Sequence, residues 1–258
     1  MRRYLIAALF LAGFASLAIG GPRSPYMGVQ GTGATSPTVV TMDGGTALVV
    51  KTANATTTTY QDTASFNAVD GKLLVVSCGI GGGGAEGTVT ITDSRDGGTG
   101  WVEKTGARWA SGNLSGGGYQ GIWVKPWTTN ASITVRCTRT GTNADDFLIV
   151  VYSLTGAASS QTGVATALLN AASDDSVYPT VAITPNYTGS LIFFNLFLPN
   201  GVTLTANASS VVGTQYSGVN TDAIFYSATT TTANTQVTMG ATNGASIFTL
   251  GSAVEIRP

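Results

Sequence analysis

The residues that could do chemistry in this chain are carboxylates, tryptophans and two cysteines, because the chain contains no histidine. It therefore lacks the side chain most used for proton transfer near neutral pH, every Ser-His-Asp arrangement and every His-containing zinc site. Hydrolysis by two carboxylates stays open, and Glu86 and Glu103 are the only glutamates before Glu255. Nothing in their spacing fixes them as a pair, so we expect a protein without catalytic activity or cofactor.

Two aspartates lie in a polar, glycine-containing turn. Asp93 and Asp96 precede Gly97 and Gly98, and calcium binds oxygen clusters of this kind. The spacing is not that of an EF-hand. The alternative is an ordinary turn in which the aspartate accepts hydrogen bonds from nearby backbone N–H groups. The same two interpretations apply to the acidic pairs at 145–146 and 174–175. We expect no bound metal, with Asp93 and Asp96 as the calcium candidates.

Aromatic residues cluster between positions 101 and 127: Trp101, Trp109, Tyr119, Trp123 and Trp127. Rows of such rings on a β-sheet can stack sugar rings or anchor a protein interface. The alternative is that two or three of them are core residues. Trp101, Trp109 and Trp127 lie near predicted turns and are expected to be exposed. With Tyr119, they are the candidate binding residues, with surface glycans as a ligand class.

Cys78 and Cys137 each lie on the apolar face of a predicted strand. In an exported protein two such residues can form a disulfide between strands or sheets. Two separate buried thiols are the alternative, because sequence does not establish the separation of the two Cα atoms.

The elements that must position these residues are β-strands. Short apolar or alternating runs recur from Thr46 onward, separated by Gly, Asn, Asp and Pro. The best helical candidate is Val164–Ala172, as one short helix or a turn. Few gaps could hold the crossovers that parallel strands need. The pattern predicts an all-β fold, an antiparallel β-sandwich of jelly-roll type. Strands are expected at 46–58, 72–80, 88–93, 131–138, 147–154, 177–184, 190–198, 223–227, 235–239 and 247–256.

The chain divides into three parts by composition. Residues 1–20 have two arginines before an apolar run and small residues before Gly21, which is typical of a signal peptide; a retained hydrophobic N-terminal helix is the alternative. Residues 21–45 are rich in Gly, Pro, Ser and Thr and predict an arm or linker, which could add to a sheet edge. Residues 46–258 are interpreted as a single β-sandwich domain. Residues 70–76 resemble 188–194, either through duplication or through chance similarity among strands.

Charge limits the partners. Only 10% of residues are charged and the formal net charge is −1. This leaves no basic surface for a phosphate backbone, so we expect no nucleic-acid partner. Contact with a membrane is expected only through residues 1–20, if they are retained.

Several segments together resemble a known family. They are ITDS (91–94), Trp101, GIWVKPW (121–127), DDFLIVVYSLTG (145–156), YPTVAITPNYTGSLIFF (178–194) and LGSAVEIRP (250–258). This resembles a poorly characterised β-sandwich family of secreted or surface bacterial proteins and tailed-phage virion proteins, over Thr46–Pro258. The resemblance implies a structural or adhesive role and brings no catalytic residues.

We therefore expect a structural or adhesive protein of an exposed assembly, on a bacterial surface or in a virion, secreted or otherwise outside the cytoplasm. Its partners would be other protein subunits, reached by subunit packing and loop presentation. A glycan-binding module using the aromatic cluster is the alternative. A carboxylate hydrolase is a further one, and it predicts loss of activity on Glu86→Gln or Glu103→Gln.

Overall fold

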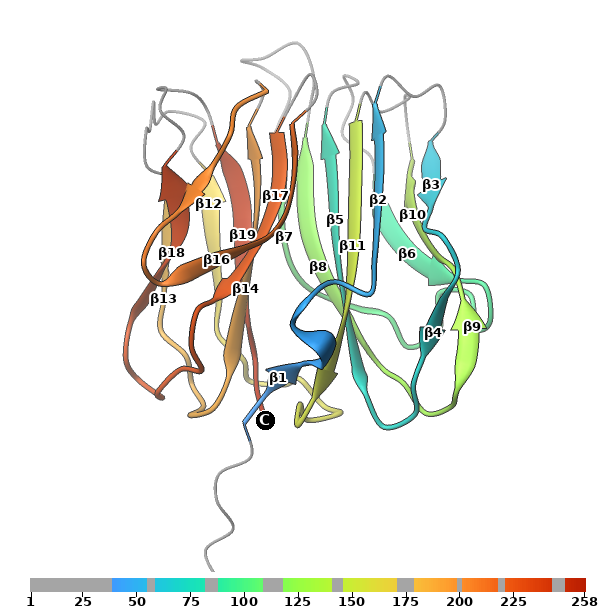
Figure 1. The fold of residues 1–258 in the computed structure, drawn as a ribbon, viewed down its shortest axis with the longest axis horizontal. Helices are drawn as coiled ribbons and strands as arrows, with labels where there is room; N and C mark the ends of the chain where they lie inside the picture. Colours follow the sequence, from blue (N-terminus) through green and yellow to red (C-terminus); the bar gives the residue numbers. More distant parts are fainter. Residues whose placement is uncertain are drawn as a thin grey trace, which may run out of the picture. The chain divides into compact units, whose positions relative to one another are not determined.

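The apolar runs of the chain form β-strands (Figure 1). The computed structural model describes residues 39–54, 59–81, 88–108, 118–140, 146–170, 179–198, 201–217, 221–242 and 249–258. Over these ranges every strand pairing is antiparallel and no α-helix occurs, so the expected all-β class is confirmed. The described residues belong to one compact unit, 36–258. The leader (1–20) and residues 21–38 of the arm lie outside them.

The first half of the chain forms one large sheet and two small ones. The large sheet has the order β1-β11-β5-β8-β7, with β2 also paired to β11. Its strands are β1 (Thr41–Met42), β2 (Val49–Asn54), β5 (Leu73–Gly81), β7 (Val102–Arg108), β8 (Tyr119–Pro126) and β11 (Asp146–Thr155). A 3-10 turn, η1 (Asp43–Gly45), separates β1 from β2. The small sheets are β3 (Tyr60–Asp62), β10 (Val135–Arg139) and β6 (Val89–Asp93), and β4 (Phe66–Ala68) with β9 (Ala131–Ile133).

The second half forms a large and a small sheet. The large sheet consists of β12 (Thr166–Asn170), β19 (Leu250–Ile256), β14 (Leu191–Leu198), β17 (Thr221–Ser227) and β16 (Ser210–Ser217), in that order. The small sheet consists of β13 (Thr180–Ile183), β18 (Val237–Thr242) and β15 (Thr205–Ala206).

Three apolar clusters hold these sheets together in layers (Figure 1). One face of the first large sheet packs on β6, β9 and β10 through Val76, Ile149 and their neighbours. Its other face packs on the second large sheet, where Tyr152 contacts Phe193 with ring centroids 5.2 Å apart. The far face of the second large sheet packs on β13 and β18. The central strands of both large sheets are therefore covered on both faces, which explains why β5, β11, β14 and β19 are buried almost throughout.

The second half repeats the strand pairing of the first. Val76 on β5 pairs with Trp123 and Val151, and Phe194 on β14 pairs with Phe225 and Ala253. A register shift interrupts β7 between Glu103 and Thr105, opposite Trp123 and Ile122. The same shift interrupts β16 between residues 212 and 214, opposite residues 225 and 224. Because strand order, register and bulge all repeat, the resemblance of 70–76 to 188–194 follows a structural repeat.

This repeat makes residues of the two halves comparable one by one. The pairing aligns β8 with β17 and β11 with β19, and the chain between these strands has the same length in both halves. Ser77 therefore corresponds to Asn195, Gln120 to Asp222 and Cys78 to Leu196. Within the equal-length segment, Cys137 corresponds to Met239, and residues 125–129 correspond to 227–231.

The helix expected over Val164–Ala172 is wrong for the described residues 164–170. Thr166–Asn170 form strand β12, which pairs with β19 from Thr166 opposite Val254 to Asn170 opposite Leu250. The sheet overrides the helical preference of Ala and Leu because β12 adds its backbone hydrogen bonds to a sheet that is already formed. Leu168 is left 58% exposed on this edge strand.

Buried polar groups fix the connection between the halves. The fully buried carboxylate of Glu255 accepts hydrogen bonds from the N–H groups of Ala165, Asn186 and Tyr187 and from the hydroxyl of Ser190, at 2.7–2.9 Å. A carboxyl group buried in this way needs such partners. Near this group, the last part of the arm adds β1 to the chain's own β11, and the N–H of Val40 donates to the carbonyl of Gly189.

Candidate functional site

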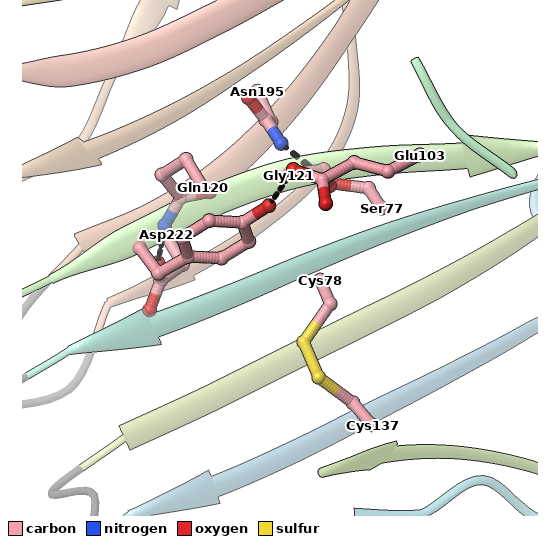
Figure 2. The surroundings of a disulfide bond; sticks show 9 residues. Ser77, Cys78, Glu103, Gln120, Gly121, Cys137, Asn195 and Asp222 are labelled. Carbon is pink, nitrogen blue, oxygen red and sulfur yellow. Dashed lines mark hydrogen bonds between the residues drawn. A yellow bond between two sulfur atoms is a disulfide. The ribbon is translucent and has the colours of Figure 1, made fainter. Parts of the chain in front are cut away.

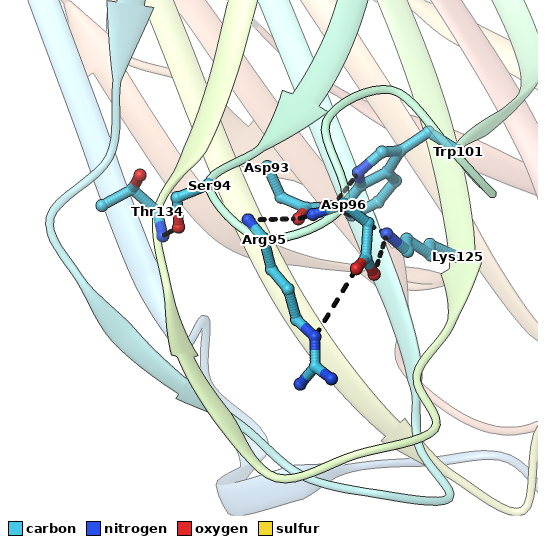
Figure 3. Close-up of polar contacts among 7 residues, drawn as sticks. All are labelled: Asp93, Ser94, Arg95, Asp96, Trp101, Lys125 and Thr134. Atoms are coloured by element: carbon cyan, nitrogen blue, oxygen red, sulfur yellow. Dashed lines mark hydrogen bonds and ion pairs between the residues drawn. The ribbon is translucent and has the colours of Figure 1, made fainter.

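Lys125, near the end of β8, is the centre of a charged and aromatic cluster (Figure 3). Its Nζ donates to Asp93 Oδ2 at 2.7 Å and to Asp96 Oδ2 at 3.0 Å. Trp101 Nε1 donates to the same Asp93 oxygen at 2.8 Å. The Nζ also lies 4.9 Å from the ring centroid of Trp127 and 5.7 Å from that of Trp101. The structure thus gathers four of the residues singled out from the sequence around a lysine that was not.

The same contacts set the protonation of Asp93. Burial acts to raise the pKa of this carboxyl, but the N–H of Asp96, the Nζ of Lys125, the indole of Trp101 and the N–H of Arg95 together hold it below its usual value. Asp93 is therefore ionised at neutral pH and neutralised by Lys125. A calcium ion at Asp93 and Asp96 would have to displace this lysine. The contacts therefore favour a turn stabilised by its own aspartate over a calcium site.

The turn after β6 is held in one conformation by its own backbone. Asp93 Oδ1 accepts from the N–H groups of Arg95 and Asp96, and Asp93 and Gly97 exchange two backbone hydrogen bonds. Gly97 has a φ of +61°, a conformation that favours glycine. Ser94 and Thr134 join the turn to the neighbouring strands by two further bonds. The side chain of Arg95 is 44% exposed and its Nε lies 3.5 Å from Asp96 Oδ1, so this turn is a braced loop that presents an exposed ion pair (Figure 3).

Replacing Lys125 with methionine tests this bracing. Lys125→Met keeps the apolar stem but leaves the buried Asp93 carboxylate without its cation. We expect a loss of about 2 kcal/mol in the free energy of unfolding, because Asp93 keeps its three N–H donors. Denaturant unfolding at pH 7 measures the change.

Arg136→Met is the matched control. Arg136 forms a two-pronged ion pair with Asp62, at 2.7 and 2.8 Å, but both side chains are exposed. Its removal is expected to lower the free energy of unfolding by less than about 1 kcal/mol. Equal losses for the two variants would contradict the bracing role of Lys125.

The aromatic cluster does not form an exposed row over the described residues. Tyr119 and Trp127 are 5% and 3% exposed and belong to the core between the first large sheet and its small partner, as does Trp123. The expectation that Trp127 is exposed is therefore wrong: its ring packs inward although it follows the end of β8. Trp101 is partly buried against the same core, and Trp109 lies outside the described residues.

A second polar group lies between the two large sheets (Figure 2). Gln120 Nε2 donates to Asp222 Oδ1 at 2.5 Å, and Asn195 Nδ2 lies 3.4 Å from Ser77 Oγ. Each pair joins a residue to its own counterpart in the other half. Ser252 adds bonds to Asn195 Oδ1 and to the carbonyl of Gln120. The halves therefore meet through hydrogen bonds as well as through apolar packing.

Asp222 is the least satisfied member of this group. It is completely buried, and its Oδ2 atom has no hydrogen-bond partner among the residues that the structure describes. Burial, and secondarily the buried Asp146 nearby, raise the pKa of Asp222 to about 7. Gly79 lies directly against the Gln120–Asp222 pair, because a Cβ atom there would approach both side chains to 2.6 Å. The Gln120–Asp222 pair is thus part of the contact between the halves.

Cys78 and Cys137 are joined in a disulfide, which resolves the alternative left open by the sequence (Figure 2). The bond links β5 of the first large sheet to β10 of the small sheet, inside their shared core. Leu196 and Met239, the corresponding residues of the second half, are both buried. One half is thus cross-linked at a place where the other has apolar packing.

Of the two glutamates considered for hydrolysis, only Glu103 lies in the described residues, so their pairing stays a prediction. Glu103 accepts a hydrogen bond from the hydroxyl of Tyr119, and Glu86 lies outside the described residues, as do Asp145 and the aspartates at 174–175. Within the described ranges no three acidic, cysteine or histidine side chains gather as metal ligands.

Sequence reasoning missed Lys125, Gln120, Asp222 and Glu255 as members of buried polar groups. The available signal was a charged or amide residue inside an otherwise apolar run, as in GIWVKPW and AVEI. Such residues need buried partners, although a sequence does not show which.

Comparisons with protein-family models, curated proteins and solved structures find no match to this chain. Among the residues placed by the structure, none forms a helix long and apolar enough to cross a membrane.

Proposed function

We propose that this chain is a non-enzymatic structural or adhesive protein of an exposed assembly, a bacterial surface or a virion, and that each half is a jelly-roll-like β-sandwich. Its activity would be to pack against other protein subunits and to present loops from a rigid scaffold. The family resemblance supports the same proposal. The arrangement fits because loops carried on a rigid scaffold are where binding residues concentrate.

The braced turn after β6 is the observation that carries this proposal. Asp93, Lys125 and Trp101 lie beneath this turn and hold its backbone, while Arg95 remains accessible. The corresponding turn of the second half, between β15 and β16, is short and is capped by Asn207, whose Oδ1 accepts from the N–H of Ser209. Of these two corresponding turns, only the one in the first half is long and braced by buried side chains. We expect such a difference when one copy of a repeated scaffold has acquired a binding role.

The disulfide supports a location outside the cytoplasm. Disulfides persist in oxidising compartments and are rare where thiols are kept reduced. The signal-like segment at residues 1–20 fits the same location.

Apolar side chains on edge strands offer a surface for subunit packing. Val50 on β2 and Leu168 on β12 occupy corresponding positions in the two halves and are 42% and 58% exposed. We expect Val50→Lys with Leu168→Lys to shift the protein from oligomer to monomer in sedimentation-velocity runs, because lysine on an edge strand opposes association.

Thr52→Lys with Thr166→Lys is the control, since both threonines are exposed on the same two strands. These variants should leave the oligomer in place. If the unmodified protein is monomeric at every concentration, or if both pairs of variants act alike, subunit packing through these strands is ruled out.

A further inference from the structure

Two surface hollows occupy corresponding places in the two halves. One is lined by the turn after β6 and by residues 125–129, and it has a volume of about 120 Å³. The other is lined by the turn after β15, by residues 227–232 and by residues 235–237, and it has a volume of about 310 Å³. Because 125–129 correspond to 227–231, these are the same feature of the repeated scaffold in two forms.

The two hollows differ in the length of the neighbouring turn and in the residues at three corresponding positions. In the first half Lys125, Pro126 and Trp127 occupy the place, and the lysine is held by carboxylates. In the second half Ser227, Ala228 and Thr229 stand there instead. The second half therefore has smaller side chains than the first half at these three positions.

The hollow of the second half has a fixed backbone. The N–H of Thr231 donates to the carbonyl of Ser190, and the N–H of Gly189 donates to the carbonyl of Thr231. On the far side of the turn, the N–H of Asn234 donates to the carbonyl of Pro185. Thr231 and Ser227 are buried and use their hydroxyls to hold neighbouring backbone. Such a site needs little ordering when a ligand binds.

Other hydroxyls of this hollow are not used by the protein. Thr229, Thr230 and Thr232 are exposed, and their side chains make no hydrogen bond to the residues that the structure describes. Gln236 adds an exposed amide at the rim. None of the lining residues is charged. The hollow therefore offers hydroxyl and amide groups next to threonine methyl groups, without a charge to balance an ionic ligand.

We propose that the hollow lined by 227–232 and 235–237 is a binding site for a neutral saccharide unit. The hydroxyls of a sugar can both donate to and accept from threonine and glutamine side chains, and its C–H faces can contact the threonine methyl groups. The volume lies at the lower end of the range for small-ligand sites, which suits one or two sugar rings. This proposal is independent of subunit packing, and it places glycan contact away from the aromatic cluster.

A glycan array with neutral and sialylated oligosaccharides is the first test. We expect binding to neutral glycans, and titration of the strongest neutral oligosaccharide should shift amide NMR signals of residues 227–237. Thr230→Trp should weaken that binding at least about tenfold by filling the hollow.

The repeat supplies a matched control in Thr128→Trp, which makes the same change at the exposed corresponding position of the first half. It should leave binding unchanged. The proposal is overturned if no neutral glycan binds, if only sialylated glycans bind, or if Thr128→Trp weakens binding as much as Thr230→Trp does. Circular dichroism of both variants separates loss of binding from loss of fold.

Discussion

We expect the stability of the unmodified protein to fall between pH 4 and pH 7, and we expect Asp222→Asn to abolish this fall. The carboxyl of Asp222 is completely buried and has a pKa raised from 3.8 to about 7. In the unfolded chain it ionises near pH 4, whereas in the folded protein it keeps its proton until about pH 7. Its contribution to stability is therefore fully present below pH 4 and is lost as the pH rises through 7.

The size of this effect follows from the pKa difference. Each pKa unit is worth about 1.4 kcal/mol, so the free energy of unfolding should be about 3 to 4 kcal/mol lower at pH 8 than at pH 4 through this group. Asparagine can keep the bond from Gln120 and cannot ionise. Denaturant unfolding of both proteins at several values from pH 4 to pH 8 measures the slope.

The carboxyls of Asp43, Asp62 and Asp93 do not contribute to the change in stability between pH 4 and pH 7. The pKa values of Asp43, Asp62 and Asp93 are lowered, so their stabilising effect is lost only as the pH falls below about 4. Asp43→Asn is therefore the control, and it should leave the slope between pH 4 and pH 7 unchanged. An equal slope in Asp222→Asn and in the unmodified protein would show that this carboxyl does not carry the effect.

The second large effect is expected from the disulfide. Removing it with Cys78→Ala and Cys137→Ala should lower the free energy of unfolding by about 4 kcal/mol, because the bond closes a loop of 59 residues in the unfolded chain. Loss of buried sulfur atoms adds to this figure. Denaturant unfolding with and without a reducing agent measures it, and the double variant should not respond to the reductant.

The second half suggests a matched variant. Cys78→Leu with Cys137→Met installs the residues that Leu196 and Met239 provide at the corresponding places. It removes the cross-link but refills the core, so it should be more stable than the double alanine variant. If reduction leaves the unfolding midpoint of the unmodified protein unchanged, the bond contributes nothing and the loop argument fails.

Strands were predictable where apolar alternation was clear. In segment 88–93, Val89 and Ile91 alternate with threonines and face inward, and in segment 131–138 the alternating residues Ile133, Val135 and Cys137 do the same. Segment 72–80 is the central strand β5 because apolar residues on both faces indicate a strand covered on both sides. These patterns follow directly from the two-residue period of a strand.

The remaining features depend on contacts that no single segment contains. Val164–Ala172 has helical propensity, but β12 gains its hydrogen bonds from β19. Trp127 was expected at the surface because of its turn-like neighbours, yet its ring belongs to the core. In the sequence the repeat was visible only as a weak similarity between residues 70–76 and 188–194. The two halves share their strand pairing and register, whereas most of their residues differ. The pairing of Gln120 with Asp222 depends on how the two halves pack.

Native mass spectrometry of the chain, exported with its own N-terminal segment and kept under oxidising conditions, tests the central claim most directly. The account predicts a multimer whose subunits lack residues 1–20 and carry one disulfide. A single full-length chain with two free thiols at every concentration would contradict it.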